Sequence, residues 1–279
     1  MTLGTTFGAR LRAAIDQRGP VCVGIDPHSS LLTAWGLTDD VAGCETFALT
    51  AVEAIAPLVS VVKPQSAFFE RFGSRGIAVL ERVIAESRAA GALVLLDVKR
   101  GAIGSTSQAY ADAYLDPTSP LASDAITVSP YLGFGSLDPI FESARKHDAG
   151  AFVLALTSNP EGPQFQHATT EDGRTVGAAV LDGLRDLNEG ETPLGSFGAV
   201  VGATIDAPGH DFDINGPLLA PGVGAQGGTA DDVRRIFGAA ARQVLPSTSR
   251  DVLRAGPDLA ALRDATRRTQ GDFASLATS

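Results

Sequence analysis

The chain has 279 residues, 44% of them hydrophobic and 19% charged, which is enough apolar sequence for a large core in one long domain or two ordinary ones. The 32 acidic residues outnumber the 22 basic ones, the formal net charge is −10, and no long basic cluster occurs, so a nucleic-acid-binding surface is not expected. No stretch approaches the apolar length that crosses a membrane, and the N-terminus lacks the apolar core of a signal peptide. We therefore expect a cytoplasmic protein that does not bind membranes.

Short apolar segments alternate along the chain with segments of helical spacing. Strands are expected at residues 21–25, 59–63, 93–96, 125–128, 151–156, 197–203, 216–221 and, more weakly, 242–246. Helices are expected at 44–58, 73–90, 140–146, 176–187 and 231–240, with another that Ser105 or Thr106 can cap, and residues 161–174 are expected to form a loop. This alternation is typical of an α/β protein with a closed (β/α)8 TIM barrel. We predict a single domain over residues 1–279, with an N-terminal helix at 5–18 and a C-terminal helical tail at 257–276.

An open doubly wound sheet is the main alternative to a barrel. Gly222, Gly224 and Gly227 fit the G-x-G-x-x-G pattern of dinucleotide-binding proteins. That pattern normally opens its βαβ unit and is followed by an acidic residue at the end of the next strand. Here the glycines follow the seventh expected strand and the next turn carries Arg250, so the position favours the barrel.

Several expected strands end in charged residues. Asp26 follows the first strand, Lys63 ends the second, and Asp97 and Lys99 follow the third. Residues two apart in an extended strand point to the same side, so Asp97 and Lys99 would face one cavity. Spacing alone explains these two equally well as an exposed ion pair of little energetic consequence. The repetition of polar groups at strand ends favours a functional site.

The glycines after the seventh strand, together with Arg250 after the eighth, predict an anion-binding site. In barrels of this kind the corresponding loops bind phosphate through backbone N–H groups and a helix N-terminus. Gly222 and Gly227 let the backbone approach an anion, Gln226 can donate its side-chain amide, and the Arg250 guanidinium matches two phosphate oxygens. A plain flexible loop explains the glycines alone equally well, and Arg250 in the adjacent loop favours phosphate.

Seven segments, in order, resemble the orotidine 5′-monophosphate decarboxylase family in its longer bacterial form. They are VGIDPH ending at His28, VVKPQ ending at Gln65, LDVKRGAIGST ending at Thr106, SPYLG from Ser129, TSNPEG from Thr157, PGVGAQGG from Pro221, and the pair Ser249 and Arg250. The resemblance covers residues 21–256 and implies a homodimeric barrel that converts orotidine 5′-monophosphate to uridine 5′-monophosphate and CO2 in pyrimidine biosynthesis.

The resemblance also implies the catalytic residues. Lys63 would pair with Asp97, and Lys99 would stand over C6 of the pyrimidine. Loss of CO2 leaves an electron pair at C6 that the ring cannot delocalise, and the sequence has no motif for thiamine, pyridoxal or a metal. We therefore expect no cofactor, with the protein itself stabilising the carbanion and Lys99 delivering the proton.

The nucleotide-binding residues follow from the same resemblance. Asp26 would bind the ribose, Thr106 the ribose of the neighbouring subunit, and Ser158 the pyrimidine ring. The loop that contains Pro221, Gln226 and Gly227 would bind the 5′-phosphate together with Arg250.

One position departs from the family motif D-x-K-x-x-D. The chain reads Asp97-Val-Lys99-Arg-Gly-Ala102, so the second carboxylate is missing. In the family this aspartate enters the partner subunit's site, where it orders the lysine and crowds the substrate carboxylate. Alanine can do neither, so we expect nucleotide binding to be retained or tighter and turnover to be severely reduced.

Two alternatives remain open on the sequence. A nucleotide-binding paralogue without catalysis would use the same phosphate and ribose contacts. A related barrel enzyme acting on a sugar phosphate keeps a similar D-x-K strand, but it usually needs a divalent metal held by an acidic residue near the second strand, where this chain has Lys63.

Overall fold

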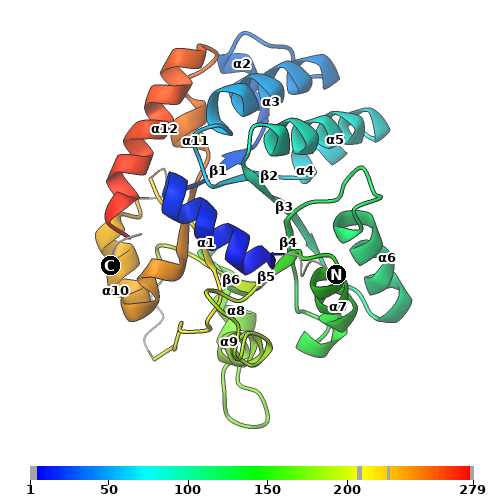
Figure 1. Cartoon of the computed structure of the whole chain (residues 1–279), viewed down its shortest axis with the longest axis vertical. Coiled ribbons are helices and arrows are strands. Elements are labelled where there is room, and N and C mark those ends of the chain that lie inside the picture. Colours follow the sequence, from blue (N-terminus) through cyan, green and yellow to red (C-terminus); the bar gives the residue numbers. More distant parts are fainter. Residues whose placement is uncertain (1–4, 206–208, 225–226, 277–279) are drawn as a thin grey trace.

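The computed structural model describes residues 5–205, 209–224 and 227–276. Within them, eight parallel strands pair in chain order and close into a barrel, because β8 also pairs with β1 (Figure 1). The strands are β1 (Cys22–Ile25), β2 (Val61–Pro64), β3 (Leu93–Arg100), β4 (Ala125–Val128), β5 (Gly150–Leu156), β6 (Phe197–Val201), β7 (Leu218–Pro221) and β8 (Val244–Thr248). The predicted (β/α)8 barrel is confirmed.

Helices connect the strands and surround the barrel (Figure 1). They are α1 (Phe7–Arg18), α2 (Ser29–Ala34), α3 (Val41–Ile55), α4 (Ala67–Glu70), α5 (Ser74–Ala89), α6 (Gly104–Leu115), α7 (Asp138–Lys146), α8 (Pro163–Gln166), α9 (Val176–Leu187), α10 (Ala230–Phe237), α11 (Arg250–Leu253) and α12 (Leu259–Phe273). Short 3-10 segments lie at Phe134–Leu137, Gly238–Gln243 and Ala274–Leu276. None of the described helices is long and apolar enough to cross a membrane.

Helix α1 packs across one end of the barrel, in dark blue in Figure 1. Its residues Phe7, Leu11 and Ile15 are buried in one cluster with inward-facing residues of the strands, including Leu95 and Phe152. The Phe7 ring lies so close to Gly150 that a Cβ there would come within 2.4 Å of it. This end of the barrel is therefore filled by side chains of the described residues, and we look for a ligand site at the carboxyl ends of the strands.

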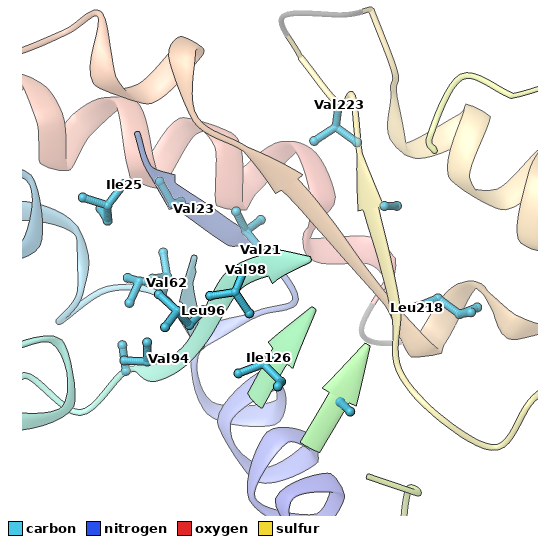
Figure 2. Packing of buried hydrophobic residues seen from close by; sticks show 14 of the residues in the cluster. Val21, Val23, Ile25, Val62, Val94, Leu96, Val98, Ile126, Leu218 and Val223 are labelled. Carbon is cyan, nitrogen blue, oxygen red and sulfur yellow. The ribbon is translucent and has the colours of Figure 1, made fainter. Parts of the chain in front are cut away.

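A second apolar layer fills the space between the strands and the surrounding helices. Figure 2 shows part of it, with labelled residues of β1 and β3 that include Val23, Val94 and Leu96. Leu95 belongs to the inner cluster, whereas its neighbours Val94 and Leu96 belong to this outer one. Burial on both faces explains why these strands read as unbroken apolar runs.

Several expected bounds are wrong. The helix expected at 44–58 is α3, which begins at Val41 and ends at Ile55, and the strand expected at 216–221 begins at Leu218. The eighth strand begins at Val244, because Val244 pairs with Leu218 and Ser247 with Pro221, and residues 242 and 243 belong to a 3-10 segment instead. Helix α6 begins at Gly104 with Ile103 as N-cap, so neither Ser105 nor Thr106 caps it. The polar stretch 161–174 contains the short helix α8.

Candidate active site

A cavity of about 430 Å³ opens at the carboxyl ends of the strands. Among the predicted site residues that are described, it is lined by Asp26, Lys63, Asp97, Lys99, Ser158, Pro221 and Arg250. These residues come from loops or strand ends that are far apart in the sequence. Closure of the barrel brings them to one cavity.

The charged centre of the cavity is Asp97. Its Oδ2 lies 3.0 Å from Lys63 Nζ and its Oδ1 lies 2.6 Å from Lys99 Nζ. Asp97 and Lys63 are each 7% exposed, while 45% of the Lys99 side chain is exposed. An exposed ion pair does not describe this arrangement, because the carboxylate is buried between two ammonium groups and only Lys99 reaches the open part of the cavity.

The protonation states follow from this geometry. Burial alone would raise the pKa of Asp97, but Lys63, Lys99 and the hydrogen bonds from Lys99 and Thr127 lower it well below its usual range. Burial would lower the pKa of Lys63, yet the negative charges of Asp97 and Asp26 raise it. Asp97 is therefore ionised and Lys63 protonated at neutral pH. Counted with the formal charge of Lys99, the three groups carry one net positive charge.

Two further residues join this centre and were not predicted. Thr127, at the end of β4, donates to Asp97 Oδ1 at 2.7 Å and accepts from the Lys99 backbone N–H at 3.0 Å. The amide of Gln65, oriented to suit its neighbours, donates to Asp97 Oδ2 at 2.7 Å and accepts from Lys99 Nζ at 3.1 Å. Both are polar residues at a strand end, which was the available signal, but neither is charged.

The backbone of β3 differs from the extended strand that the sequence predicted. Asp97 and Lys99 do face one cavity, but Lys99 has φ of 47°, in the left-handed region. The β3–β4 register also shifts between Leu96 and Arg100. A β-bulge, rather than simple alternation, aims Lys99.

Asp26 lies at the end of β1 and is 8% exposed. Its Oδ1 atom is buried and has no hydrogen-bond partner among the described residues. A buried carboxylate oxygen without a partner is costly, so this atom is suited to accept a hydrogen bond from a ligand in the cavity. Ser158, which follows β5, lines the same cavity.

The glycine loop after β7 has a first part that lines the cavity and a later part that does not. Gly222 and Val223 line the cavity beside Arg250, as does Pro221. Gly227 does not line it, and its backbone N–H donates to Gly224 O at 2.6 Å. The first part of the loop is therefore the part available to an anion near Arg250. Gln226 lies outside the described residues.

Thr106 and Ala102 do not line the cavity. Thr106 is exposed on α6, and Ala102 is buried in the segment between β3 and α6. The neighbouring residue Ile103 is 65% exposed. In the segment after β4, Tyr131 is 75% exposed and Leu132 is 54% exposed. The described residues contain no group of three or more His, Cys, Asp or Glu side chains that could hold a metal ion.

Comparisons with known proteins agree with this architecture. Residues 19–265 match the model of the orotidine 5′-phosphate decarboxylase / HUMPS family. An orotidine 5′-phosphate decarboxylase of Nocardioides sp. is 73% identical over 273 residues, covering 96% of this chain and 99% of that protein. The enzyme of the same name from Streptomyces coelicolor is 63% identical, covering 98% and 99%.

Solved structures give the same result. A crystal structure assigned to orotidine 5′-phosphate decarboxylase from Streptomyces avermitilis has a TM-score of 0.97 and 61% identity, and covers 100% of this chain and 98% of that one. The Leishmania donovani OMP decarboxylase has a TM-score of 0.77 and 29% identity, with coverage of 98% and 100%. The chain therefore belongs to the orotidine 5′-phosphate decarboxylase / HUMPS family.

Proposed function

We propose that the chain binds orotidine 5′-monophosphate and converts it to uridine 5′-monophosphate and CO2 without a cofactor, at a rate reduced by Ala102. The observation that carries this proposal is the Lys63–Asp97–Lys99 centre, in which a buried carboxylate and a buried ammonium hold a second ammonium that reaches the open part of the cavity. Its net positive charge suits a substrate that carries a carboxylate. Decarboxylases of this name from Nocardioides and Streptomyces support the choice of reaction.

The chemistry requires an ammonium group at the reacting carbon. The bond between C6 and the carboxylate breaks, CO2 leaves, and the electron pair remains on C6. The Lys99 ammonium stabilises this charge and then transfers one proton to C6, after which solvent reprotonates the amine. Two unit charges about 4 Å apart interact by roughly 4 kcal/mol at an effective dielectric constant near 20, so one lysine supplies only part of the acceleration.

The remaining stabilisation comes from groups that are fixed before the reaction. Asp97 holds the Lys99 ammonium in place through the ion pair between them, while Lys63 holds Asp97 from the buried side. Because these charges are already oriented, little reorganisation is needed as charge develops at C6. Binding energy from the distant phosphate adds to transition-state stabilisation.

We assign the nucleotide contacts to the groups around the same cavity. The buried Oδ1 of Asp26 accepts from a ribose hydroxyl, and Ser158 contacts the pyrimidine ring. Arg250 binds the 5′-phosphate together with the backbone from Pro221 to Val223. Gln226, which lies outside the described residues, is the side-chain amide that we expect to complete this phosphate site, whereas Gly227 does not line the cavity and is given no contact with the phosphate.

We infer that the working form is a homodimer with shared active sites. Ile103, Tyr131 and Leu132 expose large apolar side chains in the segments after β3 and β4, and Tyr131 packs edge-on against exposed Phe165. Exposed apolar side chains of this size are typical of a protein interface. Position 102 and Thr106 lie in the same region and would then act in the partner's site.

The cytoplasmic location is inferred from the metabolite substrate and from Cys22 and Cys44, both free thiols.

Ala102 explains why turnover would be low. A carboxylate here would bring one more negative charge to the partner's centre of Lys63, Asp97 and Lys99. Without it, the substrate carboxylate meets less repulsion, and Lys99 has one anionic neighbour fewer. Substrate binding is therefore favoured while the step that expels CO2 is not.

The test is decarboxylation of orotidine 5′-monophosphate by the unaltered chain and by Ala102→Asp, followed by ultraviolet absorbance. We expect turnover in Ala102→Asp to exceed that of the unaltered chain by at least about 10²-fold, within the range that a single catalytic group supplies. Ala102→Asp combined with Lys99→Met serves as the control and should be inactive. Inactivity of both the unaltered chain and Ala102→Asp would refute the proposed reaction, and ordinary turnover by the unaltered chain would refute the role given to Ala102.

A further inference from the structure

The backbone at Lys99 is unusual for its residue type. Among the described residues other than glycine, a positive φ occurs at Lys99, Asp148 and Asn215. Asp and Asn tolerate this left-handed region because their short side chains bond locally, whereas Lys gains no such compensation. The conformation at Lys99 must therefore be imposed by its surroundings.

The imposed conformation belongs to a bulge between two fixed points of the β3–β4 ladder. Leu96 pairs with Ile126 and Arg100 pairs with Val128, so Asp97, Val98 and Lys99 together lie opposite Thr127 alone. Beyond the bulge, the Arg100 guanidinium donates to Val98 O at 3.2 Å and to Glu70 Oε1 at 2.5 Å. The strand is thus held on both sides, and its extra length has to be absorbed at Asp97–Lys99.

A bulge leaves backbone groups without their ladder partners. At Lys99 the missing acceptor is supplied by a side chain, because the backbone N–H donates to Thr127 Oγ1 at 3.0 Å. The hydroxyl proton is then free for Asp97 Oδ1, 2.7 Å away. An ionised carboxylate cannot donate and an amide N–H cannot accept, so the direction of both hydrogen bonds is fixed.

Thr127 therefore makes hydrogen bonds to both the Lys99 backbone and the Asp97 carboxylate, two groups whose relative position must be kept for catalysis. It is 1% exposed and lines the cavity. We propose that Thr127 is a positioning residue, whose hydroxyl holds the left-handed backbone of Lys99 so that its ammonium stays at Asp97 and faces the reacting carbon. This inference rests on the proposed function of Lys99 as the proton donor.

The test compares Thr127→Val and Thr127→Ser in the Ala102→Asp protein. Valine has nearly the same shape but can neither accept from Lys99 nor donate to Asp97, whereas serine keeps the hydroxyl. We expect kcat of Thr127→Val to fall on the order of 10²-fold, as for a displacement of about 1 Å at a reacting group, while KM changes by less than about threefold. Thr127→Ser should stay within about threefold of its parent.

Thr266→Val is the matched control. Thr266 is also a fully buried threonine, and its hydroxyl donates to Leu262 O at 2.8 Å within α12, away from the cavity. We expect this variant to lose thermal stability and keep its kcat. An equal fall of kcat in Thr127→Val and Thr266→Val, or in Thr127→Val and Thr127→Ser, would show that Thr127 acts only through stability or volume and would overturn the proposal.

A second readout does not depend on activity. Hydrogen exchange of the Lys99 backbone amide, followed by NMR, should be at least about tenfold faster in Thr127→Val than in its parent and unchanged in Thr266→Val. An unchanged Lys99 exchange rate in Thr127→Val would overturn the role of Thr127 whatever the turnover. Absence of turnover in the Ala102→Asp parent would instead count against the proposed function.

Discussion

Replacement of Asp97 by asparagine would remove the carboxylate that pairs with the buried Lys63 ammonium, and Asp26 would be the carboxylate left to act on that ammonium. Lys63 Nζ lies 3.0 Å from Asp97 Oδ2, and both residues are 7% exposed. Lys99 also loses its partner, but 45% of its side chain is exposed, so water can solvate that ammonium. The destabilisation should therefore come from Lys63.

The magnitude follows from the cost of removing one partner of a buried ion pair, about 3–5 kcal/mol. At roughly 2–4 °C per kcal/mol for a chain of this size, Asp97→Asn should lower the Tm by roughly 6–20 °C. Lys63→Met should cost less, because Asp97 keeps its bonds to Lys99 and Thr127. The double variant should be more stable than the sum of the single effects predicts, with a coupling of about 1 kcal/mol or more.

The assay is thermal unfolding by circular dichroism of the four proteins of this cycle, with Asp172→Asn as control. Asp172 pairs with Arg174 on the surface, and more than half of its side chain is exposed. Its replacement should leave the Tm nearly unchanged. A loss of less than about 2 °C in Asp97→Asn, or strictly additive single effects, would refute the idea that Lys63 depends on this carboxylate.

Three further predictions concern the phosphate, the subunits and pH. Arg250→Met should weaken binding of uridine 5′-monophosphate by roughly 10–150-fold, the equivalent of about 1.5–3 kcal/mol for a charged hydrogen bond, and leave uridine binding unchanged in calorimetry. Unaltered chain mixed with the Ala102→Asp, Lys99→Met double variant should gain activity that neither protein has alone, because one subunit then supplies the lysine and the other the carboxylate; activity no higher than the sum would argue against shared sites. Folding lowers the pKa of Asp97, so the ionised carboxylate contributes its full stabilisation above about pH 4, and this contribution is lost as the pH falls further. Folding raises the pKa of Lys63, so the ammonium contributes its full stabilisation below about pH 10, and this contribution is lost as the pH rises further. The difference in Tm between the unaltered chain and its Asp97→Asn, Lys63→Met double variant should therefore be constant from about pH 5 to pH 9. Outside that range this difference should become smaller, because the unaltered chain loses the contribution of its ion pair.

The sequence was sufficient for the barrel because local pattern and tertiary packing agree along most of the chain. Strands buried on both faces must be apolar throughout, so 93–96 and 151–156 could be recognised without knowledge of their neighbours. Polar groups directly after such runs had to meet at one rim once the strands closed into a parallel barrel. That reasoning located Asp26, Lys63 and Asp97 in the cavity that the structure contains.

Local pattern could not place features that depend on pairing between strands. The start of β8 at Val244 is set by its register with β7, and the helix start at Gly104 is set by the backbone that leaves β3. Gly227 reads like its neighbours Gly222 and Gly224 in sequence, yet its amide is engaged within the loop and it does not line the cavity.

By itself the sequence determined the parallel barrel, the rim that carries the chemistry, and the charged residues available there, since these follow from composition and periodicity of single strands. Only the tertiary structure decided how the charges act. Lys63 and Asp97 are 34 positions apart and become a buried pair through the closure of β2 on β3, while the bulge opposite Thr127 turns Lys99 into the cavity. The physical reason is that burial and hydrogen-bond partners are properties of the space between strands, and no single strand encodes the register that creates this space.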